Sequence, residues 1–425
     1  MPSSAYPEFR PPALPRWAPV RQRLDEASLP DAAAATRDAL AMVIGQVSPG
    51  TRVAIAVGSR GIDRIAEVVA TVVARVREAG GEPFLVPAMG SHGGATAEGQ
   101  LAVLASYGIT PATMGCGIRS SMATIELGEV VPGVPVFIDR HAFQDADLIV
   151  PINRVKPHTG FAGPVESGLL KMIAIGLGKQ RGADTFHRQG YEAFAALIPA
   201  VARHTLTRAP IGFGVALVED GYAHLARVEA IPADRLEARE RELLDDARNR
   251  MPRLPLGAID VLILDLIGKD ISGTGMDPNV IGRAKAGAPG AGPRIGRIVV
   301  RGLTAATEGN ASGIGFADIA LRRAVDAVDA RRTYLNSITA KDVEGAKIPV
   351  TVDTDEDALG LALAACERIQ AATARIVRAR STKHLERLWI SEPALPDALA
   401  GGSCELLGDP RPIAFDSRGM LPEEA

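Results

Sequence analysis

The chain has 425 residues, of which 47% are apolar and only 4% aromatic, and its formal net charge at pH 7 is −3. A single core stops growing near about 250–300 residues, so two domains are expected. The mixed charge indicates no nucleic-acid partner. No run of about 18 apolar residues is present, so no membrane span is expected.

Cysteine usage and the N-terminus indicate a cytoplasmic protein. Cys116, Cys366 and Cys404 lie far apart and form no Cys-x-x-Cys pair, which argues against a disulfide framework and against a Cys-rich metal site. The first residues lack a basic start followed by an apolar run, so no signal peptide is predicted.

The first part of the chain predicts one unit twice: a strand, a Gly-Ser-(Arg/His)-Gly loop and a helix. Residues 1–30 are Pro-rich and expected to be extended or lightly packed, and residues 31–46 are predicted to form a helix with Asp31 as N-cap. The repeated units follow, with strands at 52–57 and 83–87 and helices at 62–79 and 96–107, the last capped by Thr96.

Arg60 and His92 occupy equivalent places in the two loops. A loop that leaves a parallel strand and enters a helix directs backbone N–H groups into the crevice where α/β sheets bind ligands. Both residues could equally be turn residues in glycine-rich connections. The duplication favours a functional interpretation.

The rest of the chain predicts more α/β structure in both domains. Strands or β-rich segments are expected at 123–138, 147–152, 211–219 and 224–230, with a helix at 191–205 and a strongly charged helix at 232–249, interpreted as a solvated linker or edge helix. The expected domains are residues 1–254 and 255–389, and residues from about 390 to 425 could return to the first. The second domain is predicted to contain strands at 258–266, 297–302 and 349–352 and helices at 316–330 and 356–380.

Residues 153–187 carry the most unusual chemistry. Lys171 interrupts the apolar run Leu-Leu-Lys-Met-Ile-Ala-Ile, so it either extends to water or serves as a nucleophile or covalent anchor. His187 is either a surface residue or a single metal ligand. His158, like His92, follows a predicted strand, and two such histidines can act as acid and base on one substrate. The Walker, GxGxxG, GxSxG and HExxH motifs are absent.

These residues resemble the nickel-dependent lactate racemase family of 2-hydroxyacid racemases and epimerases. The resemblance implies two α/β domains with mostly parallel, Rossmann-like sheets and an active site in the interdomain cleft. It implies a nickel-pincer nucleotide, a pyridinium-3-thioamide-5-thiocarboxylate mononucleotide with Ni(II), as cofactor. It also implies cofactor-assembly enzymes as partners and an anionic 2-hydroxy acid as substrate. Homo-oligomerisation is left open.

The resemblance also assigns roles to individual residues. It makes Lys171 the covalent anchor, His187 the nickel ligand, and His92 and His158 the catalytic acid and base. The remaining assignments are Arg60 and Lys285 as substrate-polarising cations, and Ser59, Gly163 and Gly168 as further cofactor contacts.

The chain departs from the family pattern around the substrate. Val57, Gly93, Ile281 and Gly282 stand where the family has other residues, so the substrate, its stereochemistry and lactate itself are left open. Two other functions remain: a non-catalytic nucleotide-cofactor-binding protein of the same fold, and a metal-independent α/β enzyme acting on an anionic metabolite.

Overall fold

The computed structural model describes residues 5–59, 61–283 and 292–423. It divides into two compact units, each with its own main β-sheet. The central unit is Asp25–Met251, and the terminal unit combines Met1–Leu24 with Pro252–Ala425. The fold is α/β, as the sequence predicted.

The central unit contains a five-stranded sheet in the order β3-β2-β6-β7-β8. The parallel strands are β2 (Arg52–Val57), β3 (Glu82–Pro87), β6 (Leu148–Arg154) and β7 (Phe213–Glu219), and β8 (Leu225–Pro232) runs antiparallel to β7. A separate hairpin joins β4 (Thr124–Val131) to β5 (Val134–Asp139). Because the four strands are parallel, the loops that follow them share one edge of the sheet, where α/β folds bind ligands.

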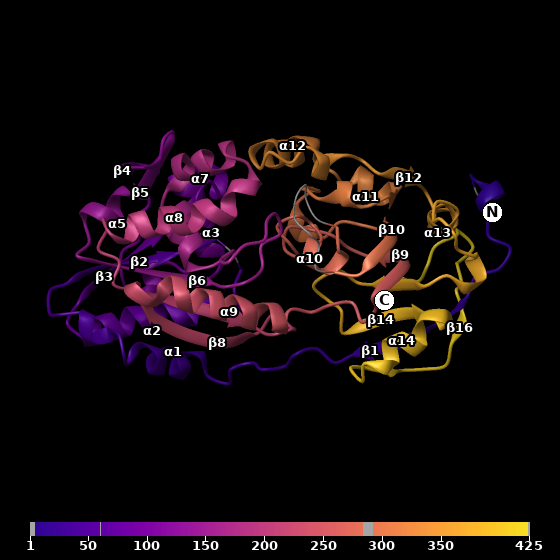
Figure 1. The fold of residues 1–425 in the computed structure, drawn as a ribbon, viewed down its shortest axis with the longest axis horizontal. Helices are drawn as coiled ribbons and strands as arrows, with labels where there is room; N and C mark the ends of the chain where they lie inside the picture. The colour runs from indigo at the N-terminus through magenta and orange to yellow at the C-terminus, as the bar shows by residue number, and fades with distance from the viewer. Residues whose placement is uncertain (1–4, 60, 284–291, 424–425) are drawn as a thin grey trace. The chain divides into compact units, whose positions relative to one another are not determined.

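Helices cover both faces of this sheet (Figure 1). Alternate residues of β2 enter different cores, with Val53 and Ile55 in one and Ala54 and Ala56 in the other. The first core includes side chains from α1 (Ala32–Leu40), α2 (Ile65–Glu78), α3 (Ala97–Ser106) and α4 (Pro111–Met114). The second includes side chains from α5 (Arg140–Gln144), α6 (Leu169–Lys171), α7 (Lys179–Arg188), α8 (Phe194–Leu206) and α9 (Leu236–Arg250).

Two predicted helix caps are confirmed. The Asp31 carboxylate accepts the Ala34 N–H at 2.8 Å, and the Thr96 hydroxyl accepts the Gly99 N–H at 3.0 Å. These side chains satisfy donors that the first turn of a helix leaves without a helical partner. α1 ends at Leu40, and a 3₁₀ turn at Ile44–Gln46 replaces the last part of the longer helix that the sequence predicted.

The terminal unit contains a nine-stranded sheet in the order β12-β11-β10-β9-β13-β14-β1-β15, with β16 also paired to β1. Its parallel strands are β9 (Ala258–Leu264), β10 (Arg294–Val300), β11 (Ile319–Leu321), β12 (Val350–Val352) and β13 (Ile376–Ala379). Its antiparallel strands are β1 (Arg16–Gln22), β14 (Arg387–Ser391), β15 (Cys404–Leu406) and β16 (Arg411–Pro412). Its helices are α10 (Pro278–Ile281), α11 (Arg322–Asp326), α12 (Ala330–Thr339), α13 (Asp355–Ala364) and α14 (Leu395–Ala400).

The structure corrects the expected course of both chain ends. The N-terminal segment is not lightly packed, because β1 pairs with β14 on one side and β15 on the other and buries Trp17 and Val20. Residues 1–24 therefore belong to the unit that contains residues 252–425, and residues 390–425 do not return to the central unit. These pairings join segments more than 300 residues apart, which no local pattern indicates.

Two predicted helices of the terminal unit are also wrong. The helix expected at 356–380 ends at Ala364, and β13 follows between β9 and β14. The helix expected at 316–330 is replaced by the short strand β11 and by α11. β11 reads in the sequence as a short apolar run, which periodicity alone cannot separate from a helix. β13 contains the buried Arg378, which hides its strand character further.

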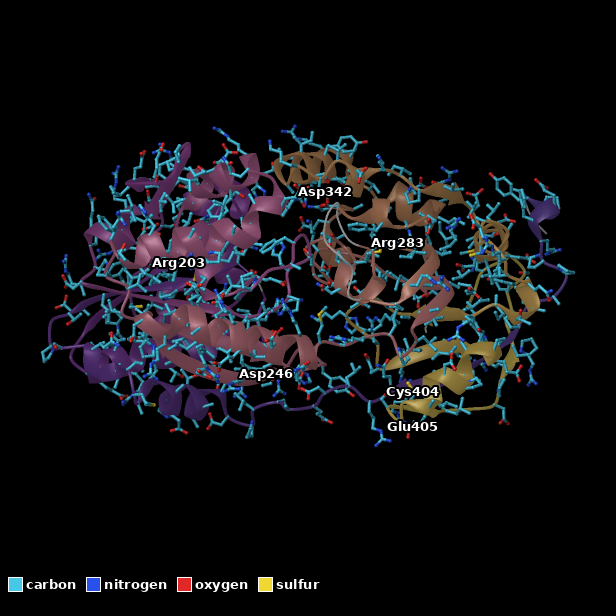
Figure 2. All side chains as sticks on the ribbon, viewed as in Figure 1. Arg203, Asp246, Arg283, Asp342, Cys404 and Glu405 are labelled. Atoms are coloured by element: carbon cyan, nitrogen blue, oxygen red, sulfur yellow. The ribbon has the colours of Figure 1, made fainter. Side chains whose placement is uncertain are left out.

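Charged side chains on the outer helices form surface ion pairs. Arg203 of α8, labelled in Figure 2, is one of them. It pairs with Glu237 of α9 at 2.7 Å. Among the described residues, no helix combines the length and the apolar character needed to cross a membrane.

Candidate functional site

Three loops at one edge of the central sheet carry sequence-predicted site residues. Ser59 follows β2, His92 follows β3 and His158 follows β6. Because β2 lies between β3 and β6, the three loops leave neighbouring parallel strands. Arg60 and Lys285 lie outside the described residues, so their predicted roles stay predictions.

Ser59 and His92 form a direct pair. The Ser59 hydroxyl is hydrogen-bonded to Nδ1 of His92, and the Tyr107 hydroxyl donates to the Ser59 carbonyl at 2.5 Å. A serine hydroxyl can accept from Nδ1–H or donate to an unprotonated Nδ1. His92 can therefore keep this partner in either neutral tautomer.

A buried cation holds the His92 loop. The Gln100 amide donates to the carbonyls of Gly90 at 2.9 Å and His92 at 3.3 Å, and its own oxygen accepts from Lys179 at 3.0 Å. The Lys179 ammonium also lies 3.0 Å from the Asp139 carboxylate and donates to the last carbonyl of β3. Burial lowers the pKa of Lys179, while Asp139 acts in the opposite direction. The loop thus rests on a fully enclosed ion pair.

A buried carboxylate holds the His158 loop. Glu166 accepts the backbone N–H of His158 at 2.5 Å and that of Gly163 at 3.2 Å. It also accepts from the Arg248 guanidinium at 2.6 Å, and Arg248 donates to the Gly163 carbonyl at 3.1 Å. Charge-assisted hydrogen bonds of this kind are the stronger ones. They join the loop to α9.

The His158 ring has a fixed orientation of its proton. The backbone N–H of Gly160 donates to Nδ1 of His158 at 2.9 Å. A backbone N–H can only donate, so this hydrogen bond requires an unprotonated Nδ1 and favours the neutral ring with its proton on Nε2. His158 therefore presents a donor, whereas the partner of His92 permits both tautomers.

An aromatic cluster brings His158 and His187 to one place. The His187 ring centroid lies 5.7 Å from that of Tyr191 and 5.6 Å from that of Phe194. The His158 ring lies 4.5 Å from Phe161 and 6.3 Å from the same Tyr191. Both rings are half-buried. Tyr191 is therefore a shared neighbour of the two histidines.

The Lys171 segment borders the loops of Ser59 and His92. Lys171 is half-buried at the end of α6, and the chain continues as a π-helix over Met172–Gly176, a form frequent at functional sites. The Gly176 carbonyl accepts the Gly90 N–H at 3.1 Å. A Cβ on Gly58 would lie 3.1 Å from the Met172 methyl group. The π-helix that follows the predicted anchor thus packs against two of the three loops.

Three glycines of the site have steric explanations. A Cβ at Gly168 would lie 2.4 Å from the Glu240 carboxylate, and one at Gly163 would lie 3.0 Å from Ala195. Gly93 has φ +68°, and its Cβ would lie 2.6 Å from the backbone nitrogen of Gln100. A larger residue at position 93 would therefore require this backbone to shift.

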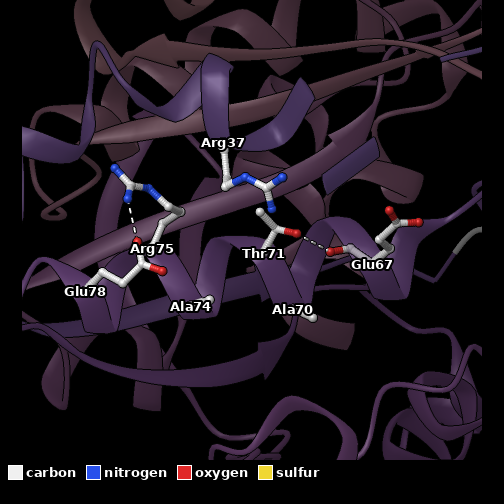
Figure 3. A pocket seen from close by; sticks show the side chains of 7 residues that line it. All are labelled: Arg37, Glu67, Ala70, Thr71, Ala74, Arg75 and Glu78. Atoms are coloured by element: carbon white, nitrogen blue, oxygen red, sulfur yellow. Dashed lines mark hydrogen bonds and ion pairs between the residues drawn. The ribbon is translucent and has the colours of Figure 1, made fainter. Parts of the chain in front are cut away.

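Groups of three or more His, Cys, Asp or Glu side chains able to hold a metal ion are absent from the described part of the chain. A shallow hollow lies elsewhere, on α1 and α2, and contains the Arg75–Glu78 ion pair of 2.5 Å (Figure 3). None of its lining residues belongs to the loops that follow β2, β3 and β6. It therefore contributes nothing to the site.

Sequence reasoning missed the residues that hold these loops in place. Glu166, Lys179 and Asp139 carry no local signal, because their partners are distant in sequence. Glu240 does carry one: it occupies a core position of α9, in register with Leu236 and Leu243.

The fold matches that of a solved protein. The structure of the lactate racemase apoprotein from Thermoanaerobacterium thermosaccharolyticum is similar over 89% of this chain and 95% of that chain, with a TM-score of 0.52 and 14% sequence identity. At this identity the likeness shows the fold. No family model and no curated protein matches the sequence.

Proposed function

We propose that the protein is a racemase or epimerase of a 2-hydroxy acid, with a nickel-pincer nucleotide anchored on Lys171. The observation that carries this proposal is the set of loops at one sheet edge, where His92 and His158 follow parallel strands next to the Lys171 segment. The fold shared with a lactate racemase apoprotein supports it. His187 is the proposed nickel ligand.

The residues fit such a cofactor. An anchoring lysine and a metal-ligating histidine must remain accessible to the group that they hold, and Lys171 and His187 are both half-buried. Ser59, Gly163 and Gly168 are proposed as further contacts. When bound, the cofactor would accept a hydride from C2 of the substrate. The C2 hydrogen is not acidic enough to be removed as a proton near neutral pH. The protein then has to move the hydroxyl proton.

The two histidines are suited to that task in different ways. The neutral His158 ring offers Nε2–H to the substrate oxygen. His92 can take up the proton at Nε2 while Ser59 accepts from Nδ1–H, and can return it from Nε2 with the Ser59 contact unchanged. The remaining predicted groups, Arg60 and Lys285, are proposed to neutralise the substrate carboxylate.

The first test is intact-protein mass and metal content after production together with cofactor-assembly enzymes. A nucleotide-sized adduct lost in Lys171→Arg, and nickel lost in His187→Ala, are the expected results. An adduct without turnover of any 2-hydroxy acid would indicate the non-catalytic alternative, and turnover without nickel the metal-independent one.

The second test separates chemistry from cofactor loading. Single enantiomers of 2-hydroxy acids and sugar acids are screened with the loaded protein. His92→Ala and His158→Ala should each keep the adduct and lower turnover by about 10²–10⁴-fold, the usual contribution of a general acid or base. Equal turnover in both variants and the unchanged protein would contradict the proposed roles.

A further inference from the structure

Helix α9 buries an acidic residue in its apolar stripe. Leu236, Glu240, Leu243, Leu244 and Ala247 are its buried residues and recur at helical spacing. The Glu240 side chain has no solvent exposure, although its position calls for an apolar residue. Burying a carboxylate costs free energy unless a specific partner donates hydrogen bonds to it.

That partner is the turn that bears Lys171. Glu240 accepts the backbone N–H of Leu170 at 3.0 Å, and its carboxylate lies where a side chain on Gly168 would have to be. α6 is a single short turn that begins at Leu169 without a side-chain cap from its own N-cap residue. Glu240 thus supplies, from another helix, an acceptor that the turn lacks.

The same helix also reaches the second histidine. Arg248 lies eight residues after Glu240 and donates to Glu166, which in turn accepts the backbone N–H of His158. The two contacts are about 12 Å apart along the axis of α9, at a rise of about 1.5 Å per residue. One rigid element therefore touches both segments.

We infer that α9 is the positioning element of the site, with Glu240 fixing the turn of Lys171 and Arg248 fixing the loop of His158 through Glu166. The functional meaning of this inference rests on the proposed function. The helix that the sequence indicated to be a solvated linker is then a spacer that sets the distance between anchor and acid. α9 also carries surface ion pairs, such as that of its Glu237 with Arg203 of α8.

The test uses variants that act on one contact each, in the full-length chain without cofactor. Glu240→Leu keeps the volume and removes the acceptor, whereas Glu240→Gln keeps a carbonyl acceptor and should rescue. Arg248→Met, combined with Glu166→Gln, removes the second contact without leaving a buried charge. Glu242→Leu is the matched control, because Glu242 lies on the same helix and its side chain is 63% exposed.

Two readouts report the two segments. Hydrogen exchange is measured at amides 169–176 and 158–163, and the acylation rate of Lys171 is measured relative to exposed Lys383. Glu240→Leu should speed exchange at 169–176 and change the Lys171 rate by about fivefold, the effect of one hydrogen bond, and leave 158–163 unchanged. The Arg248→Met, Glu166→Gln double variant should speed exchange at 158–163 and leave exchange at 169–176 and the Lys171 rate unchanged.

The adduct measurement is then made on the same variants. Glu240→Leu is expected to lower the fraction of folded protein that carries the adduct, and Glu240→Gln to restore it. If Glu240→Leu and Glu242→Leu give the same exchange and acylation, the inference is overturned, whatever the adduct shows. If the selective exchange pattern appears but the unchanged protein never forms an adduct, α9 still positions the two segments and the proposed function fails.

Discussion

The two histidine loops leave parallel strands on either side of β2, yet opposite charges hold them. The His92 loop rests on a buried cation, Lys179, which has no exposed surface and pairs with the equally buried Asp139. The His158 loop rests on a buried anion, Glu166, whose partner Arg248 keeps 36% of its side chain exposed. The first loop is therefore fixed by an ion pair inside the core. The second loop is fixed to α9, so substitutions in α9 can alter the second loop without altering the first.

The same two loops differ in what they permit at the imidazole. A serine hydroxyl contacts His92, whereas a backbone N–H contacts His158. A hydroxyl adapts to either tautomer, and an amide does not. His92 and His158, which have the same predicted role, thus differ in the tautomers that their partners permit. The following experiments test the differences between the two loops.

The largest effect is expected at the support of the first loop. Lys179→Met leaves the Asp139 carboxylate buried without its cation, so the free energy of unfolding should fall by about 3–5 kcal/mol. Chemical denaturation measures it. The double variant with Asp139→Asn should recover most of the loss, because asparagine can still accept the Ala142 N–H that Asp139 accepts at 2.8 Å. A loss below about 1 kcal/mol, as for a surface pair, would show that the buried pair does not support the loop.

The stabilising effect of Glu240, which holds the Lys171 turn, should depend on pH. Burial raises the pKa of Glu240 to about 7 from 4.5, against the effect of the N–H groups of Leu170 and Leu169. Because the folded pKa lies above the unfolded one, the stabilising effect of the protonated acid is present below pH 4.5 and is lost as the pH rises through 7. At about 1.4 kcal/mol per pKa unit, the loss approaches about 3 kcal/mol.

Glu240→Gln isolates this effect, since it does not titrate. The difference in unfolding free energy between Glu240→Gln and the unchanged protein should grow by about 3 kcal/mol in favour of the variant between pH 4.5 and pH 8. A difference that stays constant across this range would mean that Glu240 ionises as freely in the folded chain as in the unfolded one.

Adjacent glycines of the first loop provide a matched pair. Gly94→Ala introduces a Cβ at φ +65° into open space and should cost about 1–2 kcal/mol from backbone strain alone. Gly93→Ala adds contact with the backbone of Gly99 and Gln100 at 2.6 Å and should cost about 2–4 kcal/mol. Thermal unfolding of both variants checks the order, and equal losses would show that the loop can move away from α3.

The smallest effect concerns the tautomers. One hydrogen bond from Gly160 should favour the Nε2–H form of neutral His158 by about fivefold. Nitrogen chemical shifts of labelled histidine measure it. Ser59→Ala should change the tautomer ratio of His92 and leave that of His158 unchanged. Equal populations of the two tautomers at His158 would remove the distinction between the two loops.

The sequence predicted the parts of the fold that depend on neighbouring residues. The duplicated strand–loop–helix units and the caps at Asp31 and Thr96 are visible locally, because period and capping are properties of adjacent residues. The placement of His92 and His158 after parallel strands followed from the same patterns. β1 and β13 were missed, because their strand character depends on partners more than 300 and more than 100 residues away, respectively.

The sequence by itself determined which residue types are present for chemistry: a lysine in an apolar run, two loop histidines and a third after a glycine-rich segment. The tertiary structure alone decided what holds them. Lys179, Glu166 and Glu240 acquire their positions only when distant elements close around them, because a buried charge is tolerated only beside the partner that folding brings to it. Residue order specifies the candidates, and packing specifies their geometry.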